Sequence, residues 1–280
     1  ILPVSQFIDS VLVTNLLKWG GKAGPIAQYG LWSGVVTPLI NLPVMVCISL
    51  GIAVTPQMVE GKQKRDIDFI LEKAATANKL TYLMGVPFVF FYLFMAGGII
   101  KLLFPSLSGE QTKTAVMLLM IGAPSVIGLS VFQIYSAMLQ GLGRAKAPVI
   151  IMGTCMAVKL ALTVILTPVM GITGCAIAAV VGYLGSGIWI TVYFANFAAL
   201  DAEYAKNASL ITLCGVIMGM LIFMSGKLQS SWASVAVIGI IAGTVYFLAV
   251  LTLKVFSREE LKSLPLSGLL IKINDKINGE

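Results

Sequence analysis

The sequence contains no histidine, and only 11% of its 280 residues are charged. Without histidine there is no His-based metal site, no His-containing catalytic triad and no histidine proton shuttle. Because soluble domains are typically about 25% charged, the scarcity of charge excludes a soluble globular protein. The four cysteines stand singly in apolar segments. This pattern favours small buried side chains over disulfides or a metal site, and we expect no metal and no cofactor.

Long apolar segments take up most of the chain. Hydrophobic residues make up 58% of it, and the mean hydropathy is +0.95. A backbone in lipid must satisfy its own hydrogen bonds, so apolar segments of roughly 20 residues cross the membrane as helices. We therefore predict an all-α polytopic membrane protein with about eight transmembrane helices. The predicted spans are 1–17, 27–55, 80–104, 114–139, 147–168, 171–197, 208–226 and 232–255.

The basic residues predict an orientation in the membrane. Thirteen Lys and Arg lie in 56–79, 140–147, 198–207 and the region after 253, and five lie in the opposite connections. Cytoplasmic loops carry the excess of basic residues, so we expect a cell-membrane protein with a cytoplasmic C-terminus. The placement is a topology pattern and argues against a nucleic-acid partner. The first span begins without a Met, and we interpret it as a truncated helix in a fragment of a longer protein.

Two polar segments have apolar residues at helical spacing. Segment 62–78 predicts a cytoplasmic helix that lies on the membrane surface. Segment 257–280 predicts a cytoplasmic amphipathic tail that begins with a capping box at Ser257 and Glu260. For the tail, a simple anchor among membrane lipids is favoured over a specific lipid or partner contact.

Asp9 and Lys159 are the acidic and basic residues that lie deep inside predicted spans. A charge at the bilayer centre costs at least about 2.5–3.5 kcal/mol, which makes such residues functional candidates. Their opposite signs predict an ion pair across the bundle. The pair either couples or gates transport, which we favour, or it fixes the register of two helices. The depth of Lys159 argues against a side chain that snorkels to the surface.

Polar residues spaced by about four form rows on two predicted helices. Ser33, Thr37 and Asn41 share one face of the second span, and Gln133 and Gln140 share one face of the fourth. In hydrocarbon such rows face other helices or a wet cavity. We therefore predict that these five side chains line a substrate cavity.

Prolines and small residues mark two further helices. Pro38 and Pro43 interrupt the second span, and Pro56 is expected to end it. Interrupted helices mark substrate and hinge regions in transporters, although prolines are also tolerated in a packed bundle. Gly174 and Gly182 belong to a row of small residues that predicts close helix packing.

Several elements in this order resemble a known family. They are Phe7-Ile-Asp-Ser-Val-Leu-Val, Tyr29-Gly-Leu-Trp-Ser-Gly with Pro38-Leu-Ile-Asn-Leu-Pro, Leu139-Gln-Gly-Leu-Gly-Arg with Pro148, Lys159, and Gly171-Ile-Thr-Gly-Cys-Ala-Ile-Ala. Together they resemble the polysaccharide biosynthesis and stage V sporulation protein B family. That family belongs to the multidrug, oligosaccharidyl-lipid and polysaccharide exporter superfamily, as does the bacterial lipid II flippase.

The resemblance implies an architecture. Members have about fourteen helices, in two six-helix lobes with extra helices at the C-terminus. On this pattern residues 1–197 form the C-terminal six-helix lobe, with its first helix truncated. Residues 198–256 supply two additional transmembrane helices. The N-terminal lobe is expected in the full-length protein.

The resemblance also implies a function that is not enzymatic. Members move lipid-linked oligosaccharides, carried on undecaprenyl pyrophosphate as cell-wall or polysaccharide precursors, across the membrane by alternating access. Lipid II flippases hold a sodium ion in this lobe. Asp9 matches its first ligand, while Lys159 and Thr163 occupy the corresponding face of the eleventh helix. Because a lysine is incompatible with an adjacent cation, Lys159 is expected to replace the ion in a coupling or gating site.

Two alternatives stay open. A multidrug exporter of the same superfamily usually needs an unpaired carboxylate for organic cations, whereas Asp9 has a lysine partner. A membrane enzyme of polyprenyl-lipid metabolism needs clustered carboxylates or histidines. Asp66 and Asp68 come nearest to such a cluster, and a solvated cytoplasmic face explains them better. The second span also lacks the cavity arginines of lipid II flippases, which weakens lipid II as the specific substrate.

Overall fold

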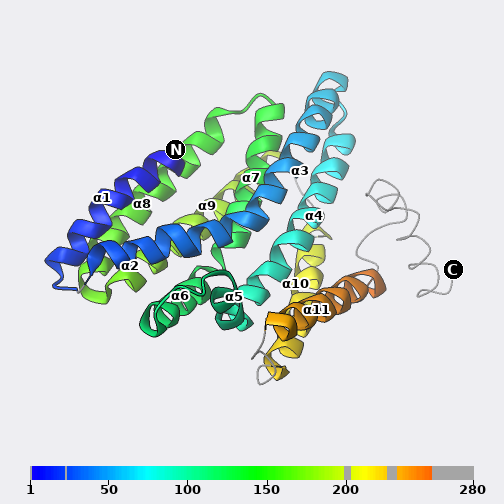
Figure 1. The fold of residues 1–280 in the computed structure, drawn as a ribbon. Helices are drawn as coiled ribbons and strands as arrows, with labels where there is room; N and C mark the ends of the chain where they lie inside the picture. Colours follow the sequence, from blue (N-terminus) through cyan, green and yellow to red (C-terminus); the bar gives the residue numbers. More distant parts are fainter. Residues whose placement is uncertain (1, 23, 199–202, 226–231, 254–280) are drawn as a thin grey trace.

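The computed structural model describes residues 2–22, 24–198, 203–225 and 232–253, and regular structure in these ranges is helical. Figure 1 shows the helices as one bundle, with the first helix at one side and the last at the other. In chain order the helices are α1 (Leu2–Trp19), α2 (Pro25–Leu31), a π-helical turn η1 (Trp32–Val36), α3 (Thr37–Lys64), α4 (Ile67–Phe94), α5 (Ala96–Leu103), α6 (Gly109–Gly122), α7 (Ser125–Gly141), α8 (Lys146–Met170), α9 (Ile172–Ala198), α10 (Glu203–Met224) and α11 (Trp232–Thr252).

Helix α7 lies at the centre of the bundle. It packs against α3, α4 and α9, and most of its side chains are buried. Helix α1 lies along α8 at one side, as Figure 1 shows. Helices α10 and α11 pack on α4 at the other side, where buried residues of α4, α10 and α11 form a second apolar cluster. The division at residues 197 and 256 stays a prediction, and tail 257–280 lies outside the described residues.

The fold class is confirmed. Within the described residues, five helical segments are long and apolar enough to cross a membrane, and α6 with α7 makes a sixth if this bent pair is one span. Helix α1, which carries Asp9 and Lys18, is not among them, and the apolar part of α10 is shorter. The structure therefore supports five or six of the eight predicted spans on length and apolarity.

The predicted surface helix over 62–78 is wrong. Helix α3 continues through Pro56 to Lys64, and α4 begins at Ile67 after a tight turn. Asp66 caps α4 by accepting a hydrogen bond from the Phe69 amide at 2.9 Å. A Cβ on Gly61 would lie 2.6 Å from Ile70 Cγ1, so the two helices approach closely. Ile70 lies against Gly61 and Ala74 is buried, whereas Ile67 is 65% exposed, so most of this apolar spacing serves the contact between the two helices of the hairpin.

Two other predicted spans are broken. The span over 80–104 ends as a continuous helix at Phe94, and α5 begins at Ala96. The span over 114–139 bends by 45° between α6 and α7, at Pro124. Because proline lacks a backbone N–H and its ring clashes with the preceding turn, this position favours a break.

Pro38 accounts for the π-helical turn. A proline at this position supplies no amide hydrogen to the carbonyl of Gly34. The chain widens by one residue just before it, and the amide of Thr37 bonds the Trp32 carbonyl. The Thr37 hydroxyl donates to the same carbonyl at 2.8 Å. Segment 25–64 therefore continues as one bent helical stretch of 40 residues.

Pro43 leaves another backbone carbonyl without its helical donor, that of Leu39. The Tyr92 hydroxyl of α4 donates to this carbonyl at 2.6 Å, and both groups are buried. Since an unpaired carbonyl in an apolar interior is costly, this contact makes Pro43 tolerable inside a packed helix.

Pro87 repeats the arrangement in α4. It leaves the Leu83 carbonyl without a helical donor, and the Tyr246 hydroxyl of α11 donates to that carbonyl at 3.2 Å. One tyrosine thus joins α4 to α3, and another joins α11 to α4.

Glycines allow the closest helix crossings. A Cβ on Gly128 of α7 would lie 2.5 Å from the Tyr183 carbonyl oxygen of α9. A Cβ on Gly174 of α9 would lie 2.5 Å from the Leu166 carbonyl oxygen of α8. The predicted close packing of the row that contains Gly174 is confirmed.

We predict that Tyr92→Phe destabilises the full-length protein by about 1–3 kcal/mol, because the Leu39 carbonyl loses its donor. Thermal unfolding in detergent measures the effect. Pro43→Ala should recover most of the loss in the same background, since an alanine amide can bond that carbonyl again. Tyr82→Phe is the control, because its hydroxyl makes no hydrogen bond to the described residues. Equal losses in the two Phe variants would contradict the prediction.

Candidate functional site

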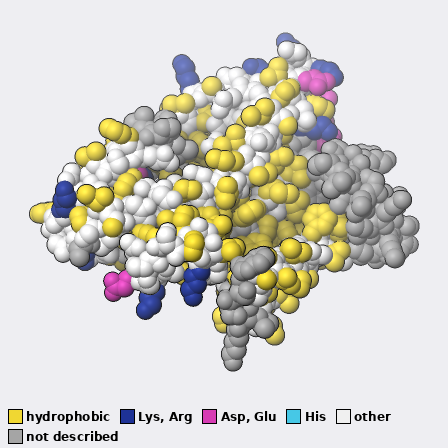
Figure 2. Space-filling model, in the orientation of Figure 1, with side chains coloured by type: hydrophobic (Ala, Val, Ile, Leu, Met, Phe, Trp, Pro, Cys, Tyr) yellow, Lys and Arg dark blue, Asp and Glu magenta, His cyan; other side chains and the backbone are white. Residues whose placement is uncertain are grey.

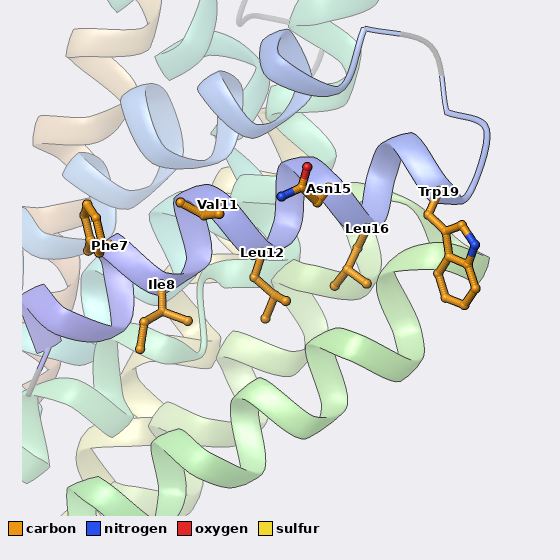
Figure 3. Close-up of a pocket in the computed structure, with 7 residues that line it drawn as sticks. All are labelled: Phe7, Ile8, Val11, Leu12, Asn15, Leu16 and Trp19. Atoms are coloured by element: carbon orange, nitrogen blue, oxygen red, sulfur yellow. The ribbon is translucent and has the colours of Figure 1, made fainter.

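Helix α1 has one buried face and one exposed face. Ser5, Asp9 and Val13, spaced by four residues, are buried toward the bundle. The opposite face carries a shallow groove of about 580 Å³, and the described residues that line it all belong to α1. Figure 3 shows this face, with Ile8, Leu12 and Leu16 in one row and Phe7, Val11 and Asn15 in a second. Asp9 thus points away from the groove and into the lobe.

Asp9 and Lys159 form the predicted ion pair. The Lys159 ammonium of α8 bonds Oδ2 of Asp9, and the two side chains are only 1% and 5% exposed. The ammonium also donates to the Ser5 hydroxyl oxygen at 3.2 Å. Three side chains from α1 and α8 therefore make one buried polar cluster.

This cluster holds the buried charges of the described chain. No other acidic or basic side chain among the described residues is buried. Oδ1 of Asp9 is buried as well and accepts no hydrogen bond from them. A buried pair gains little net stability unless its remaining lone pairs are also satisfied. The pair is thus energetically expensive, and its second carboxylate oxygen has no protein partner among the described residues.

Helix α9 makes room for the lysine. A Cβ on Gly182 would lie 2.7 Å from Cβ and 3.2 Å from Cγ of Lys159. One turn further along, a Cβ on Gly185 would meet only the Cys155 sulfur, at an ordinary 3.9 Å. Gly182 therefore sets the path of the lysine stem toward α1.

The remaining neighbours of the pair are neutral. Tyr29, Cys175 and Tyr183 lie within electrostatic range of Asp9. The Tyr29 hydroxyl donates to the Gln6 carbonyl at 3.3 Å and not to Asp9. The lysine is therefore the charged partner that the described structure offers to Asp9.

Thr163, the third residue of the predicted coupling site, is also buried. Its hydroxyl donates to the Lys159 carbonyl at 2.9 Å, one turn earlier in α8. It therefore touches the backbone of Lys159 and not its ammonium group.

No hydrogen bond within the described structure joins any two of the five predicted cavity residues. Ser33 is exposed and donates to the Tyr29 carbonyl at 3.0 Å, and Thr37 bonds the Trp32 carbonyl as described. Asn41 and Gln133 are half-buried. Gln140 is exposed and donates to the Ser136 hydroxyl at 3.1 Å. None of the five lines either described surface groove, and their role in a cavity stays a prediction.

Sequence reasoning missed the contacts of three residues. Ser5 was not predicted as part of the site, although its spacing of four from Asp9 places it on the same helix face. Lys22 donates to the Val169 carbonyl at 3.2 Å, near the end of α8. Lys62 donates to the Leu142 carbonyl at 2.9 Å, just after α7. Both lysines add positive charge where a helix dipole is negative, which spacing along the sequence does not reveal.

Solved structures share this fold. The chain resembles a lipid II flippase MurJ in the inward closed conformation, with a TM-score of 0.60 and 12% identity, over 85% of this chain and 51% of that one. It also resembles a MOP superfamily transporter from Pyrococcus furiosus Vc1, with a TM-score of 0.58 and 15% identity, over 99% of this chain and 66% of that one. The fold is that of a polytopic transporter of this superfamily.

The sequence model of one family matches residues 37–255, and its description is "Lipid II flippase MurJ". The chain belongs to this family. It is 27% identical to stage V sporulation protein B of Bacillus subtilis (strain 168), over 96% of this chain and 52% of that protein. It is 20% identical to the lipid II flippase MurJ of the same organism, over 88% and 47%. The chain spans about half the length of the curated relatives that it matches.

We predict that the stability effects of Asp9→Asn and Lys159→Gln are strongly non-additive. Each single change leaves a buried group without its partner, at a cost of about 3–5 kcal/mol, whereas removing both charges is closer to neutral. The double variant should therefore resist thermal unfolding better than either single variant. Purified full-length protein in detergent is the sample, and Lys18→Gln, an exposed charge on the same helix, is the control. Additive losses would show that the two charges are not coupled.

Proposed function

We propose that the full-length protein carries lipid-linked oligosaccharides, anchored on undecaprenyl pyrophosphate, across the cytoplasmic membrane by alternating access. The membership of the MurJ family and the similarity to stage V sporulation protein B support this substrate class. The chain supplies the C-terminal lobe with two additional helices, and its C-terminus lies in the cytoplasm. An N-terminal lobe completes the substrate cavity in the longer protein.

The observation that carries the mechanism is the buried pair of Asp9 and Lys159. It joins α1 to α8, and no described group bonds the second carboxylate oxygen of Asp9. Any movement of α1 along α8 breaks the pair and leaves two charges in an apolar interior. Such an element has discrete states, because its intermediate positions cost the most free energy. The pair therefore couples the position of α1 to the conformational cycle of the lobe.

Lys159 supplies the positive charge that a bound cation provides in relatives with a sodium site. Its ammonium group occupies the position next to Oδ2 of Asp9, and Gly182 leaves space for its stem. An internal cation of this kind never dissociates into solution. We expect this site to need no bound sodium ion.

The paired state of Asp9 also argues against the export of organic cations. A cationic drug needs a carboxylate that is accessible and free of a positive partner, and Asp9 is buried against a lysine. The solved multidrug transporters of the superfamily share the fold, at 16% identity, and add no residue-level evidence. Asp66, one of the two carboxylates considered for an enzyme, caps α4 and thus has a structural role.

We predict that the double variant Asp9→Asn with Lys159→Gln fails to complement a flippase-deficient strain, although it folds and reaches the membrane. The charges are gone, so the movement of α1 no longer has two distinct states. Growth of the strain at matched protein levels is the measurement, and Lys18→Gln should complement fully. Full growth with the double variant would restrict the pair to a structural role. Increased drug susceptibility in place of the growth defect would favour the multidrug exporter.

We also predict that transport continues when sodium is replaced by choline. Flipping of a fluorescent lipid-linked oligosaccharide in proteoliposomes should proceed at the same rate in both buffers, because Lys159 holds the charge. A sodium-dependent relative measured in the same way is the control. A several-fold loss of rate without sodium would overturn the role of Lys159 as an internal cation.

A further inference from the structure

A second groove lies at the end of the bundle where α5 and α6 meet. It has a volume of about 510 Å³ and is lined by both helices. Its apolar residues lie on consecutive turns of α6, from Val116 to Ile121. Two cations, Lys101 of α5 and Lys113 of α6, stand among the same lining residues.

Both lysines are exposed, and neither forms an ion pair with the described residues. Glu110 lies three residues before Lys113 on α6 and does not line the groove. No carboxylate is present among its lining residues, so the groove presents only positive charge. Figure 2 shows Lys and Arg side chains at this lower edge of the molecule, together with acidic side-chain atoms and near hydrophobic surface.

The start of α6 holds Lys113 in place beside the groove. A capping box between Ser108 and Gln111 begins α6. Lys113 follows in the second turn, and Glu110 in the first turn offsets part of the positive end of the helix dipole. The favourable field for a bound anion therefore comes from the two lysines.

We propose that this groove binds an anionic phospholipid of the surrounding membrane, with the phosphate between Lys101 and Lys113 and one acyl chain along α6. A small soluble anion would leave the apolar wall of the groove uncovered, so it fits less well than a lipid. A zwitterionic lipid lacks the net negative charge that the two lysines favour. Lysine stems at the end of an apolar helix reach the headgroup level of a bilayer. By the predicted topology the site lies in the outer leaflet. The proposal does not depend on the substrate that is transported.

A lipid with a reactive acyl chain tests the site directly. The full-length protein is reconstituted in phosphatidylcholine vesicles that contain phosphatidylglycerol with a photoactivatable acyl chain, and crosslinked peptides are identified by mass spectrometry. The peptide with Met117 and Met120 should be labelled. Labelling should fall on the order of fivefold for each of Lys101→Gln and Lys113→Gln. Lys18→Gln, an exposed lysine outside the groove, should not change it.

Three outcomes would overturn the proposal. The first is equal labelling by phosphatidylcholine with the same acyl chain, which would mean that charge plays no part. The second is loss of labelling in Lys101→Arg with Lys113→Arg, which keeps both charges and should retain the site. The third is displacement of the phosphatidylglycerol probe by equimolar polyprenyl pyrophosphate, which would assign the groove to the transported lipid. Complementation of a flippase-deficient strain is scored separately, so failure of this site leaves the proposed transport function untouched.

Discussion

Polar groups that leave water must find partners inside this molecule, and most of its specific contacts follow from that requirement. Pro43 and Pro87 each free a backbone carbonyl, and tyrosines of neighbouring helices donate to those carbonyls. Asp9 and Lys159 meet the same requirement with charges. In each case the partner comes from another helix, so satisfying a local defect also fixes how two helices are placed.

The tyrosine hydrogen bonds and the ion pair differ in how completely they satisfy the buried polar groups. The tyrosine bonds satisfy their carbonyls and lock α4 to α3 and α11 to α4. The ion pair leaves one carboxylate oxygen without a hydrogen bond from the described residues. A satisfied hydrogen bond between neutral groups favours one arrangement, whereas an ion pair that breaks leaves two buried charges at a larger cost. The contact between α1 and α8 is therefore the costlier of the two kinds to break.

Some of this was accessible from the sequence. Asp9 and Lys159 stood out because a charge inside an apolar span is costly whatever its surroundings, and their opposite signs predicted the pair. The row of small residues that includes Gly174 and Gly182 predicted close packing on the same kind of local argument. The surface helix over 62–78 was wrong because its apolar spacing fits a helix hairpin as well as a membrane surface. Two contacts favour the hairpin over a separate surface helix: Gly61 lets Ile70 approach closely, and Asp66 caps the start of α4.

Composition and spacing alone therefore established a helical membrane protein and its two exceptional charges, because both follow from the free energy of placing residues in lipid. The family resemblance came from particular motifs along the chain. Tertiary structure decided which groups become partners. Ser5 accepts a hydrogen bond from Lys159, and Gly182 leaves space for the lysine stem. Tyr92 and Tyr246 donate to the carbonyls that lack a helical donor because of Pro43 and Pro87. Lys101 and Lys113 line one groove. Each of these contacts joins residues brought together by helix packing, and a hydrogen bond or ion pair depends on distances that no pattern along the chain specifies.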